Sequence, residues 1–304
     1  MKRNKLIPAA LSLMLVLALA ACGGTPATTP APATPTPGAE ATPAPTAAPT
    51  ATPSAEGDGS LQRVLDAGVL TVGAEGNWIP YVYNKDGTGD LTGFEVEIAR
   101  EVASRLGVEV QFQIADSWDP VLAGLDASRY DAVICGVNPD PDRQEKYAVS
   151  IPYAENPFCL VVNGDNTEIT SFDDLEGKLC INSPSSSAGK IAKSYGATTA
   201  DGDLTAAMEQ LNTGRADGHV NNVAAVDEYM TSRPEVNVKV AAIYEPPAGQ
   251  EYEIQSAVML RKGDQELCDK ISEILQEMID DGTCYDLTVQ FFGQSVADSI
   301  SIYP

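Results

Sequence analysis

The feature that most constrains this chain is the alternation of helix-like and strand-like segments from Ser60 onward. Apolar residues recur at helical spacing from Phe94 to Leu106, and Gly107 supplies a natural helix end. Residues 108–114 then alternate apolar and polar side chains, as a strand with one solvated face does. The same succession continues along the chain. It is typical of a mainly parallel α/β sheet, and we therefore predict an α/β fold.

Two short extended segments, near residues 158–162 and 252–258, bracket a second α/β set. We therefore expect one lobe to be inserted into another and joined to it by two hinge strands. The expected first lobe covers residues 60–158 and the second covers residues 159–251. Residues 252–304 are expected to return to the first lobe as a strand and C-terminal helices. A segment of this length is ample for two small cores.

The N-terminus has the pattern of a secretory signal. Within residues 1–21, three basic residues precede an apolar stretch, Leu11–Ala21, that is too short to span a bilayer comfortably. The apolar stretch leads into the tetrapeptide L-A-A-C, in which the cysteine is Cys22. This tetrapeptide resembles the bacterial lipobox. The resemblance implies cleavage before Cys22 and a lipid anchor on it. The alternative is an ordinary signal with an incidental cysteine.

Residues 22–59 are predicted to form a tether. Between positions 25 and 58, Pro, Thr and Ala dominate and no aliphatic residue is larger than alanine, so nothing there can nucleate a core. A semi-extended segment of this kind would hold the folded part away from the membrane.

The chain is strongly acidic, with a formal net charge of -24 and a pI near 4.2. This balance argues against a nucleic-acid partner, because phosphate binding requires clustered lysine and arginine. We interpret the acidity as the solvated surface of a protein outside the cell.

Five cysteines follow the lipobox, and none is arranged as C-x-x-C, which disfavours a zinc or redox motif. Cys135, Cys159 and Cys180 lie in apolar, strand-like runs and are expected to act as small buried hydrophobes. Cys268 and Cys284 could pair across the last two helices. We predict no metal site and no cofactor.

The stretch from Asp131 to Arg143 is the first candidate for a ligand site. Its apolar run fits a buried strand that stops at Gly136, where only a hydrogen faces an approaching group. Asp140 and Pro141 form a cap pattern, which puts Arg143 at the start of a helix beyond the strand's carboxyl end. A guanidinium there could hold a carboxylate through two parallel bonds. The alternative is a surface arginine paired with a neighbouring acid.

Polar or aromatic residues follow the expected strands in both halves of the chain. They are Trp78, Trp118, Asn138 and Arg143 in the first half, and Ser185, Ser186, Ser187 and Asn222 in the second. Ligands of open α/β sheets bind at the carboxyl ends of the strands. We therefore expect a ligand in a cleft between the lobes, with closure driven by higher affinity for the closed state.

Residues 60–293 resemble the solute-binding proteins of polar amino-acid ABC importers, which have the type II periplasmic binding fold. The resemblance is carried by G-V-L-T-V-G from Gly68, E-G-N-W-I-P-Y from Glu75, L-T-G-F-E-V-E-I-A from Leu91, L-G-V from Leu106, W-D from Trp118, Y-D-A-V-I-C-G from Tyr130, Arg143, D-G-T from Asp281 and F-G from Phe292. Their order and spacing together are specific.

The resemblance implies that Arg143 clamps the α-carboxylate of the ligand and that Ser186 adds a hydroxyl from the second lobe. Trp78 and Trp118 would form aromatic walls, although both could instead be core residues. The complete predicted ligand-binding set is Glu75, Trp78, Trp118, Cys135, Gly136, Asn138, Arg143, Ser185, Ser186, Ser187 and Asn222.

The chain departs from the family pattern at the ammonium end of the ligand. Asn222 stands where the family usually has an aspartate, and Asn138 replaces a Ser or Thr, so the charge-assisted part of one ligand bond is lost. Glu75 could take over the cationic partner role or contact the ligand's polar tail, and it could equally be a solvated loop acid. His219, the only histidine, is interpreted as a structural or surface residue.

The resemblance implies an extracytoplasmic, lipid-anchored, monomeric receptor. It would capture a small polar amino acid or a related zwitterion and deliver it to an ABC permease. One alternative is an enzyme on the same fold, such as a cyclohexadienyl-type dehydratase, for which Glu75 is the only well-placed acid. A further alternative is a sensor-type ligand-binding module.

Overall fold

The computed structural model describes residues 57–85 and 89–304, and the account below concerns those residues. The predicted signal, Cys22 and nearly all of the predicted tether lie outside them. None of the helices in this described part is long and apolar enough to cross a membrane.

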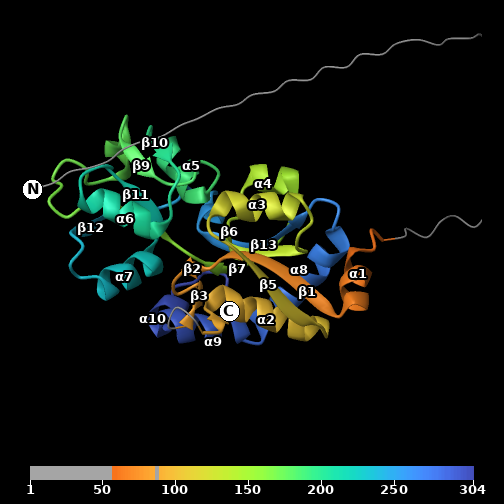
Figure 1. Ribbon diagram of the computed structural model, residues 1–304. Helices are drawn as coiled ribbons and strands as arrows, with labels where there is room; N and C mark the ends of the chain where they lie inside the picture. The colour runs from red at the N-terminus through yellow and green to blue at the C-terminus, as the bar shows by residue number, and fades with distance from the viewer. Residues whose placement is uncertain (1–56, 86–88) are drawn as a thin grey trace, which may run out of the picture. The chain divides into compact units, whose positions relative to one another are not determined.

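The first lobe is built on a five-stranded mixed sheet with the strand order β5-β1-β6-β13-β7 (Figure 1). Strands β5, β1 and β6 are parallel, whereas β13 pairs antiparallel with both β6 and β7. The strands are β1 (Val69–Glu75), β5 (Glu109–Ala115), β6 (Ala132–Val137), β7 (Tyr147–Glu155) and β13 (Gln255–Arg261). The predicted α/β fold is confirmed.

The order in which the chain forms the strands of this sheet indicates where a ligand would bind. From β1 it passes through α2 (Phe94–Leu106) to β5, and from β5 it returns through α3 (Trp118–Asp126) to β6 on the other side of β1. Because such crossovers are right-handed, the reversal puts α2 and α3 on opposite faces of the sheet (Figure 1). Ligands of open α/β sheets bind where the strand order reverses, which here is at the carboxyl ends of β1 and β6.

The other elements of the first lobe complete its layers and its edge. The helices are α1 (Ser60–Ala67), α4 (Pro141–Lys146), α8 (Gln265–Asp280), α9 (Thr283–Phe292) and α10 (Gln294–Ala297). A small antiparallel sheet of β2 (Asn77–Trp78), β3 (Val82–Asn84) and β4 (Leu91–Thr92) follows β1.

The second lobe is less parallel than expected. Its central strand β8 (Phe158–Asn163) pairs antiparallel with both β11 (His219–Asn222) and β12 (Val238–Ile243). Only β9 (Leu179–Ile181) and β10 (Thr198–Ala200) form a parallel pair. Three helices cover these strands: α5 (Ser187–Ser194), α6 (Leu204–Asn212) and α7 (Val223–Ser232).

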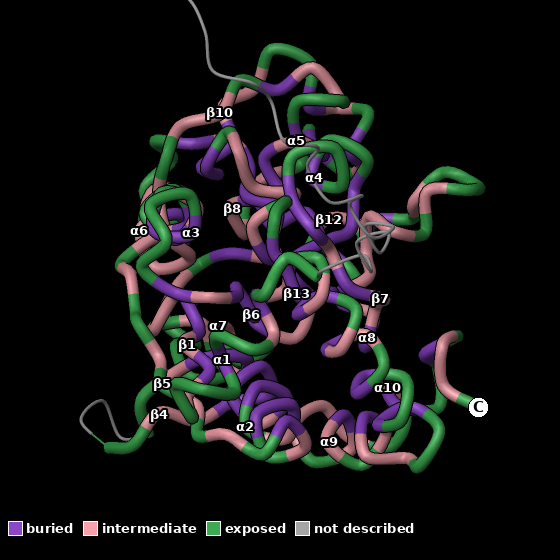
Figure 2. The backbone as a smooth tube through the Cα atoms, turned by 90° about the vertical axis from the view of Figure 1, so that its right-hand side faces the viewer, coloured by how far each residue is buried: buried purple, intermediate pink, exposed green. Residues whose placement is uncertain are grey.

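Strand β8 organises the core of the second lobe because both of its faces are buried. Phe158, Leu160 and Val162 belong to one apolar cluster, and Cys159 and Val161 belong to another. This division follows from the alternation of side chains along a strand. In Figure 2 the buried segments run along strands of both lobes, and the exposed segments lie mostly in loops and outer helices.

The chain crosses between the two sheets twice, and the crossings are hydrogen-bonded to each other. The N–H of Asn156 donates to the carbonyl of Ile254 at 2.5 Å, and its side-chain amide donates to Ser256 Oγ at 2.6 Å. A pair of tied crossing segments is the arrangement expected of a hinge. The lobe boundaries at residues 158/159 and 251/252 remain a prediction.

The possible disulfide between Cys268 and Cys284 is not formed. Both thiols are free and buried, as are the other three cysteines of the described residues. Cys268 lies in the first turn of α8, while Cys284 follows the end of that helix at Asp280. The intervening helix rises about 18 Å, whereas a disulfide needs Cα atoms within about 7 Å.

Candidate functional site

A cavity of about 130 Å³ lies where the strand ends of the two lobes meet. Of the predicted ligand-binding set, ten residues line it: Glu75, Trp78, Trp118, Cys135, Gly136, Asn138, Arg143, Ser186, Ser187 and Asn222. Ser185 does not. Strands β1, β2, β6 and β11 and helices α3, α4 and α5 thus bring residues from distant parts of the chain to one place.

Arg143 is held rigidly at the start of α4. The carboxylate of Asp140 caps this helix by accepting from the N–H of Arg143 at 3.0 Å. Nη1 of Arg143 donates to the carbonyl of Asn138 at 3.0 Å and to Ser187 Oγ at 2.8 Å. Within residues 57–85 and 89–304, Nε and Nη2 have no protein acceptor. The guanidinium therefore keeps two donors for a ligand.

The interpretation of Arg143 as a surface residue is wrong, because its side chain is only 7% exposed. Burial lowers the pKa of the guanidinium from its usual value, and the neighbouring Asp140 carboxylate opposes that change. An arginine keeps its charge under such a shift, so the group is a buried cation beside the cavity. Asp140, 3.5 Å from Nη1, offsets part of this charge, and an anionic ligand group on Nε and Nη2 would offset it further.

Two tryptophans form apolar walls. Trp78 stacks on Tyr81 with ring centroids 4.0 Å apart, and its ring lies over Gly136. Gly136 has φ +60°, and a Cβ there would come within 2.5 Å of the Trp78 ring, so glycine is required for both reasons. Trp118 is buried, and the Arg143 guanidinium lies 5.3 Å from its ring centroid. Trp118 is therefore both a core residue and a wall of the cavity.

Glu75 ends β1 beside the end of β6. Its backbone N–H contacts Cys135 Sγ at 3.5 Å, and its side chain enters the cavity. Burial, reinforced by repulsion from Asp203, Asp201 and Asp119, raises the pKa of Glu75 to about 7. The interpretation as a solvated loop acid is wrong, because Glu75 is half-buried and lies in the wall of the cavity.

The two asparagines use their amides to join segments of the fold. Asn138 donates from Nδ2 to the carbonyls of Glu253 at 2.9 Å and Gln255 at 2.7 Å, while its buried Oδ1 has no partner in the described part of the chain. Asn222 donates from Nδ2 to the carbonyl of Asn156 at 2.8 Å. Asn138 has therefore used both of its N–H donors and keeps only its oxygen, whereas Asn222 keeps its oxygen and one N–H. An aspartate at 222 could not donate to Asn156.

The hydroxyls of Ser185, Ser186 and Ser187, which lie before or at the start of α5, have partners in different lobes. Ser186 caps α5 by accepting from the N–H of Gly189 at 3.0 Å. Ser187 accepts from Arg143, as described above. Ser185 instead donates to the carboxylate of Asp119 in the first lobe, as Ser183 does at 3.0 Å. Ser185 therefore belongs to the contact between the lobes and not to the cavity wall.

Several residues that line the cavity were not in the predicted ligand-binding set, among them Asn77, Asp201, Asp203 and His219. Asn77 of the first lobe donates from Nδ2 to Asp203 Oδ2 of the second at 3.2 Å. Asp203 also caps α6 by accepting from Ala206 N–H at 2.7 Å. Asp201 directly follows β10 and Asp203 lies two residues further on, but no strand was predicted at residues 198–200, so the rule that ligands bind at strand ends was not applied there.

His219 is buried, so the interpretation as a surface residue is wrong and the structural one holds. Its Nδ1 bonds to the carbonyl of Ile181 and its Nε2 lies 3.0 Å from Asn221 Nδ2. Burial lowers the pKa of His219 to about 4, so the ring is neutral at physiological pH. The described residues contain no group of three or more His, Cys, Asp or Glu that could hold a metal ion.

Comparison with known proteins agrees with this geometry. The family model for bacterial extracellular solute-binding proteins, family 3, matches residues 70–294. A probable amino-acid ABC transporter-binding protein of Haemophilus influenzae is 34% identical over 236 residues, which cover 77% of this chain and 88% of that protein.

Two solved structures are also similar. An ancestral arginine-binding protein bound to arginine is 30% identical, with a TM-score of 0.66 over 74% of this chain and 99% of that one. The L-cystine solute receptor of Neisseria gonorrhoeae, in its unliganded open conformation, is 34% identical, with a TM-score of 0.50 over 78% of this chain and 98% of that one.

All three relatives are binding proteins or receptors, so the dehydratase alternative is not supported, and the chain is an amino-acid-binding protein with the type II periplasmic binding fold. The matched segment covers both lobes and every residue that lines the cavity. The chain belongs to family 3 of the bacterial extracellular solute-binding proteins.

Proposed function

We propose that this protein is a lipid-anchored, monomeric receptor that binds a small polar amino acid or related zwitterion in the interlobe cavity and delivers it to an ABC permease. The observation that carries the proposal is the buried guanidinium of Arg143, which keeps two donors free beside the cavity. A carboxylate accepts two parallel bonds from such a fork, and burial strengthens both.

The acidic residues of the cavity wall are proposed to bind a positively charged group of the ligand. Glu75, Asp201 and Asp203 line the cavity, and Arg143 is the only Lys or Arg side chain among the lining residues of the described part. Glu75 is proposed as the partner of a positively charged group of the ligand, with the Asn222 oxygen as an additional acceptor. Arginine and cystine, the ligands named for the two solved relatives, both carry cationic groups in addition to carboxylate.

The anchor and the delivery step rest on the sequence. The lipobox-like segment ending in Cys22 supports attachment to the outer face of the cell membrane, and the relative named as an ABC transporter-binding protein supports a permease partner. Radiolabelled palmitate incorporation that is lost in Cys22→Ser, with Cys135→Ser as control, tests the anchor. Equal incorporation in the Cys22 variant would contradict it.

A thermal-shift panel tests the ligand class. L-arginine, L-lysine, L-cystine, L-glutamine and L-glutamate are compared at 1 mM, and a ligand that binds only the folded state raises the Tm by mass action. We expect the largest rise for a ligand that carries both a carboxylate and an extra cationic group. A larger rise with L-glutamate than with L-arginine would contradict the role of Glu75, and no rise with any amino acid would contradict the function.

A further inference from the structure

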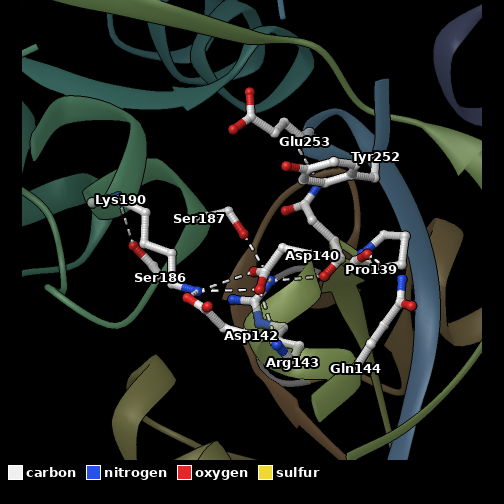
Figure 3. Close-up of polar contacts among 12 residues, drawn as sticks. Pro139, Asp140, Asp142, Arg143, Gln144, Ser186, Ser187, Lys190, Tyr252 and Glu253 are labelled. Atoms are coloured by element: carbon white, nitrogen blue, oxygen red, sulfur yellow. Dashed lines mark hydrogen bonds and ion pairs between the residues drawn. The ribbon is translucent and has the colours of Figure 1, made fainter. Parts of the chain in front are cut away.

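Helix α5 of the second lobe and helix α4 of the first lobe are joined beside the cavity by charged side chains (Figure 3). Lys190 Nζ lies 3.2 Å from both carboxylate oxygens of Asp140 and 3.0 Å from Asp142 Oδ2. We call Lys190, Asp140 and Asp142 the clasp. None of the three lines the ligand cavity.

Asp140 is the shared member of the clasp. The same carboxylate that contacts Lys190 caps α4 and lies 3.5 Å from Arg143 Nη1. Its side chain is 13% exposed, compared with 38% for Lys190 and 84% for Asp142. Water therefore screens Asp140 least, and its interactions with the two cations are the strong ones. The exposed pair of Lys190 with Asp142 contributes little.

The charge of this cluster depends on whether the lobes touch. Without Lys190, Asp140 and Arg143 form a neutral pair, and the Asp140 carboxylate offsets part of the field that Arg143 directs into the cavity. Lys190 in contact adds one positive charge, which offsets Asp140, while the exposed Asp142 carboxylate that also pairs with Lys190 is largely screened by water. A ligand carboxylate on Arg143 is then held more strongly, and a ligand shifts a conformational equilibrium only through such a difference in affinity.

We propose that Lys190 is a positioning residue that holds the second lobe closed on Asp140 and, by neutralising Asp140, strengthens the grip of Arg143 on the ligand carboxylate. Ser187, also on α5, acts in the same direction because its hydroxyl accepts from Arg143 Nη1 at 2.8 Å. The structure also matches the arginine-bound relative better than the open one, although the open one is more similar in sequence.

Three variants separate the clasp from general effects of charge. Lys190→Met removes the charge at similar length, and Lys190→Arg restores it. Lys193→Met is the matched control, because Lys193 lies on the same helix but donates to the Pro184 carbonyl of its own lobe at 3.3 Å. All three are compared with wild type in thermal unfolding to confirm that they are folded.

The first measurement needs no ligand. Dyes on cysteines introduced at the exposed residues Glu109 of β5 and Glu209 of α6 report the lobe distance by single-molecule energy transfer. At roughly 20 mM NaCl we expect Lys190→Met to lower the closed population about threefold, with the arginine and Lys193 variants near wild type. Roughly 500 mM NaCl should open the wild type and leave Lys190→Met unchanged. A closed population unaffected by Lys190→Met would overturn the clasp.

The second measurement addresses the link to Arg143. We expect Lys190→Met to bind L-arginine about fivefold more weakly in calorimetry, mainly through faster dissociation, and Lys190→Arg to restore the affinity to within about twofold. Equal affinity in wild type and Lys190→Met, despite a lower closed population, would overturn the coupling to the carboxylate. Because the first measurement uses no ligand, it decides on the clasp even if the proposed ligand class is wrong.

Discussion

Arg143 and Glu75, two ionisable groups of the cavity wall, are held in opposite ways. Arg143 is fixed within the first lobe by the Asp140 cap and the Asn138 carbonyl. The carboxyl group of Glu75 has no hydrogen-bond partner in the described part of the chain, and burial raises its pKa to about 7. For the proposed ligand, recognition of the carboxylate would therefore be preformed, while recognition of the cation would depend on the protonation of Glu75.

The largest effect on ligand affinity is expected at Arg143. Arg143→Ala should weaken ligand binding at least 100-fold, because it removes two charge-assisted bonds and leaves the ligand carboxylate unpaired. Arg143→Lys keeps the charge but loses the planar fork, and it should recover only part of the affinity. Calorimetry with the best ligand of the panel measures both. Affinity within threefold of wild type in Arg143→Ala would show that Arg143 is not the clamp.

Ligand binding that depends on Glu75 should respond to pH. Glu75 is neutral below its pKa of about 7 and charged above it, so affinity for L-arginine should rise by up to tenfold per unit as the pH increases toward 7, and level off above about 8. Glu75→Gln should bind more weakly at pH 8 and lose the rise. A pH profile of the variant that matches the wild type would assign the titration to another group.

The same residue should destabilise the free protein at high pH. Folding raises the pKa of Glu75 from 4.5 to about 7. As the pH rises, the unfolded protein therefore loses the Glu75 proton at a lower pH than the folded protein does. The contribution of Glu75 to the free energy of unfolding consequently falls between about pH 4.5 and about pH 7. Glu75→Gln should therefore melt at a higher temperature than wild type at pH 8 and at a similar one at pH 4.5. The opposite order at pH 8 would mean that Glu75 is already stabilised as a carboxylate.

A smaller effect is expected at Asn222. Asn222→Asp removes the donor to the Asn156 carbonyl and should cost about 1–3 kcal/mol of stability, seen as a Tm several degrees lower in the free protein. The new carboxylate should also increase the Tm rise caused by amino acids with a free ammonium group. Asn222→Ala serves as the control, since it loses the same bond and gains no charge. Equal ligand-induced rises in the two variants would argue that position 222 does not face the ammonium.

The smallest effect is expected at Ser185, which contacts Asp119 and not the cavity. Ser185→Ala should change the affinity less than threefold, whereas Ser187→Ala, which removes an acceptor of Arg143, should change it more. A loss of tenfold or more in Ser185→Ala would place its hydroxyl on the ligand.

Arg143 could be predicted because its signals are local. An apolar strand, a glycine and an Asp-Pro cap stand next to one another in the sequence, and together they position one side chain at a strand end. Asp201 and His219 were missed or misinterpreted because nothing in their own segments indicates a cavity. They reach it only because the end of β10 and the whole of β11 lie beside it.

The incorrect expectations for the Cys268–Cys284 pair and for Ser185 also arise because contacts depend on the tertiary structure. Cys268 and Cys284 are close in sequence, but a straight helix separates them. Ser185 and Ser187 are two residues apart, but the start of α5 turns one hydroxyl toward Asp119 and the other toward Arg143. Short separation along the chain does not predict contact when a helix begins or runs between two residues.

The sequence by itself determined the α/β architecture, the family and the position of Arg143 beyond a strand end, because periodicity, capping and strand-end position are local properties of the chain. Only the tertiary structure decided the charge state of Glu75, the lining by Asp201 and Asp203, and the contact of Lys190 with Asp140. These depend on distances between groups from separate elements and on their removal from water, and both quantities exist only once the two lobes are in place.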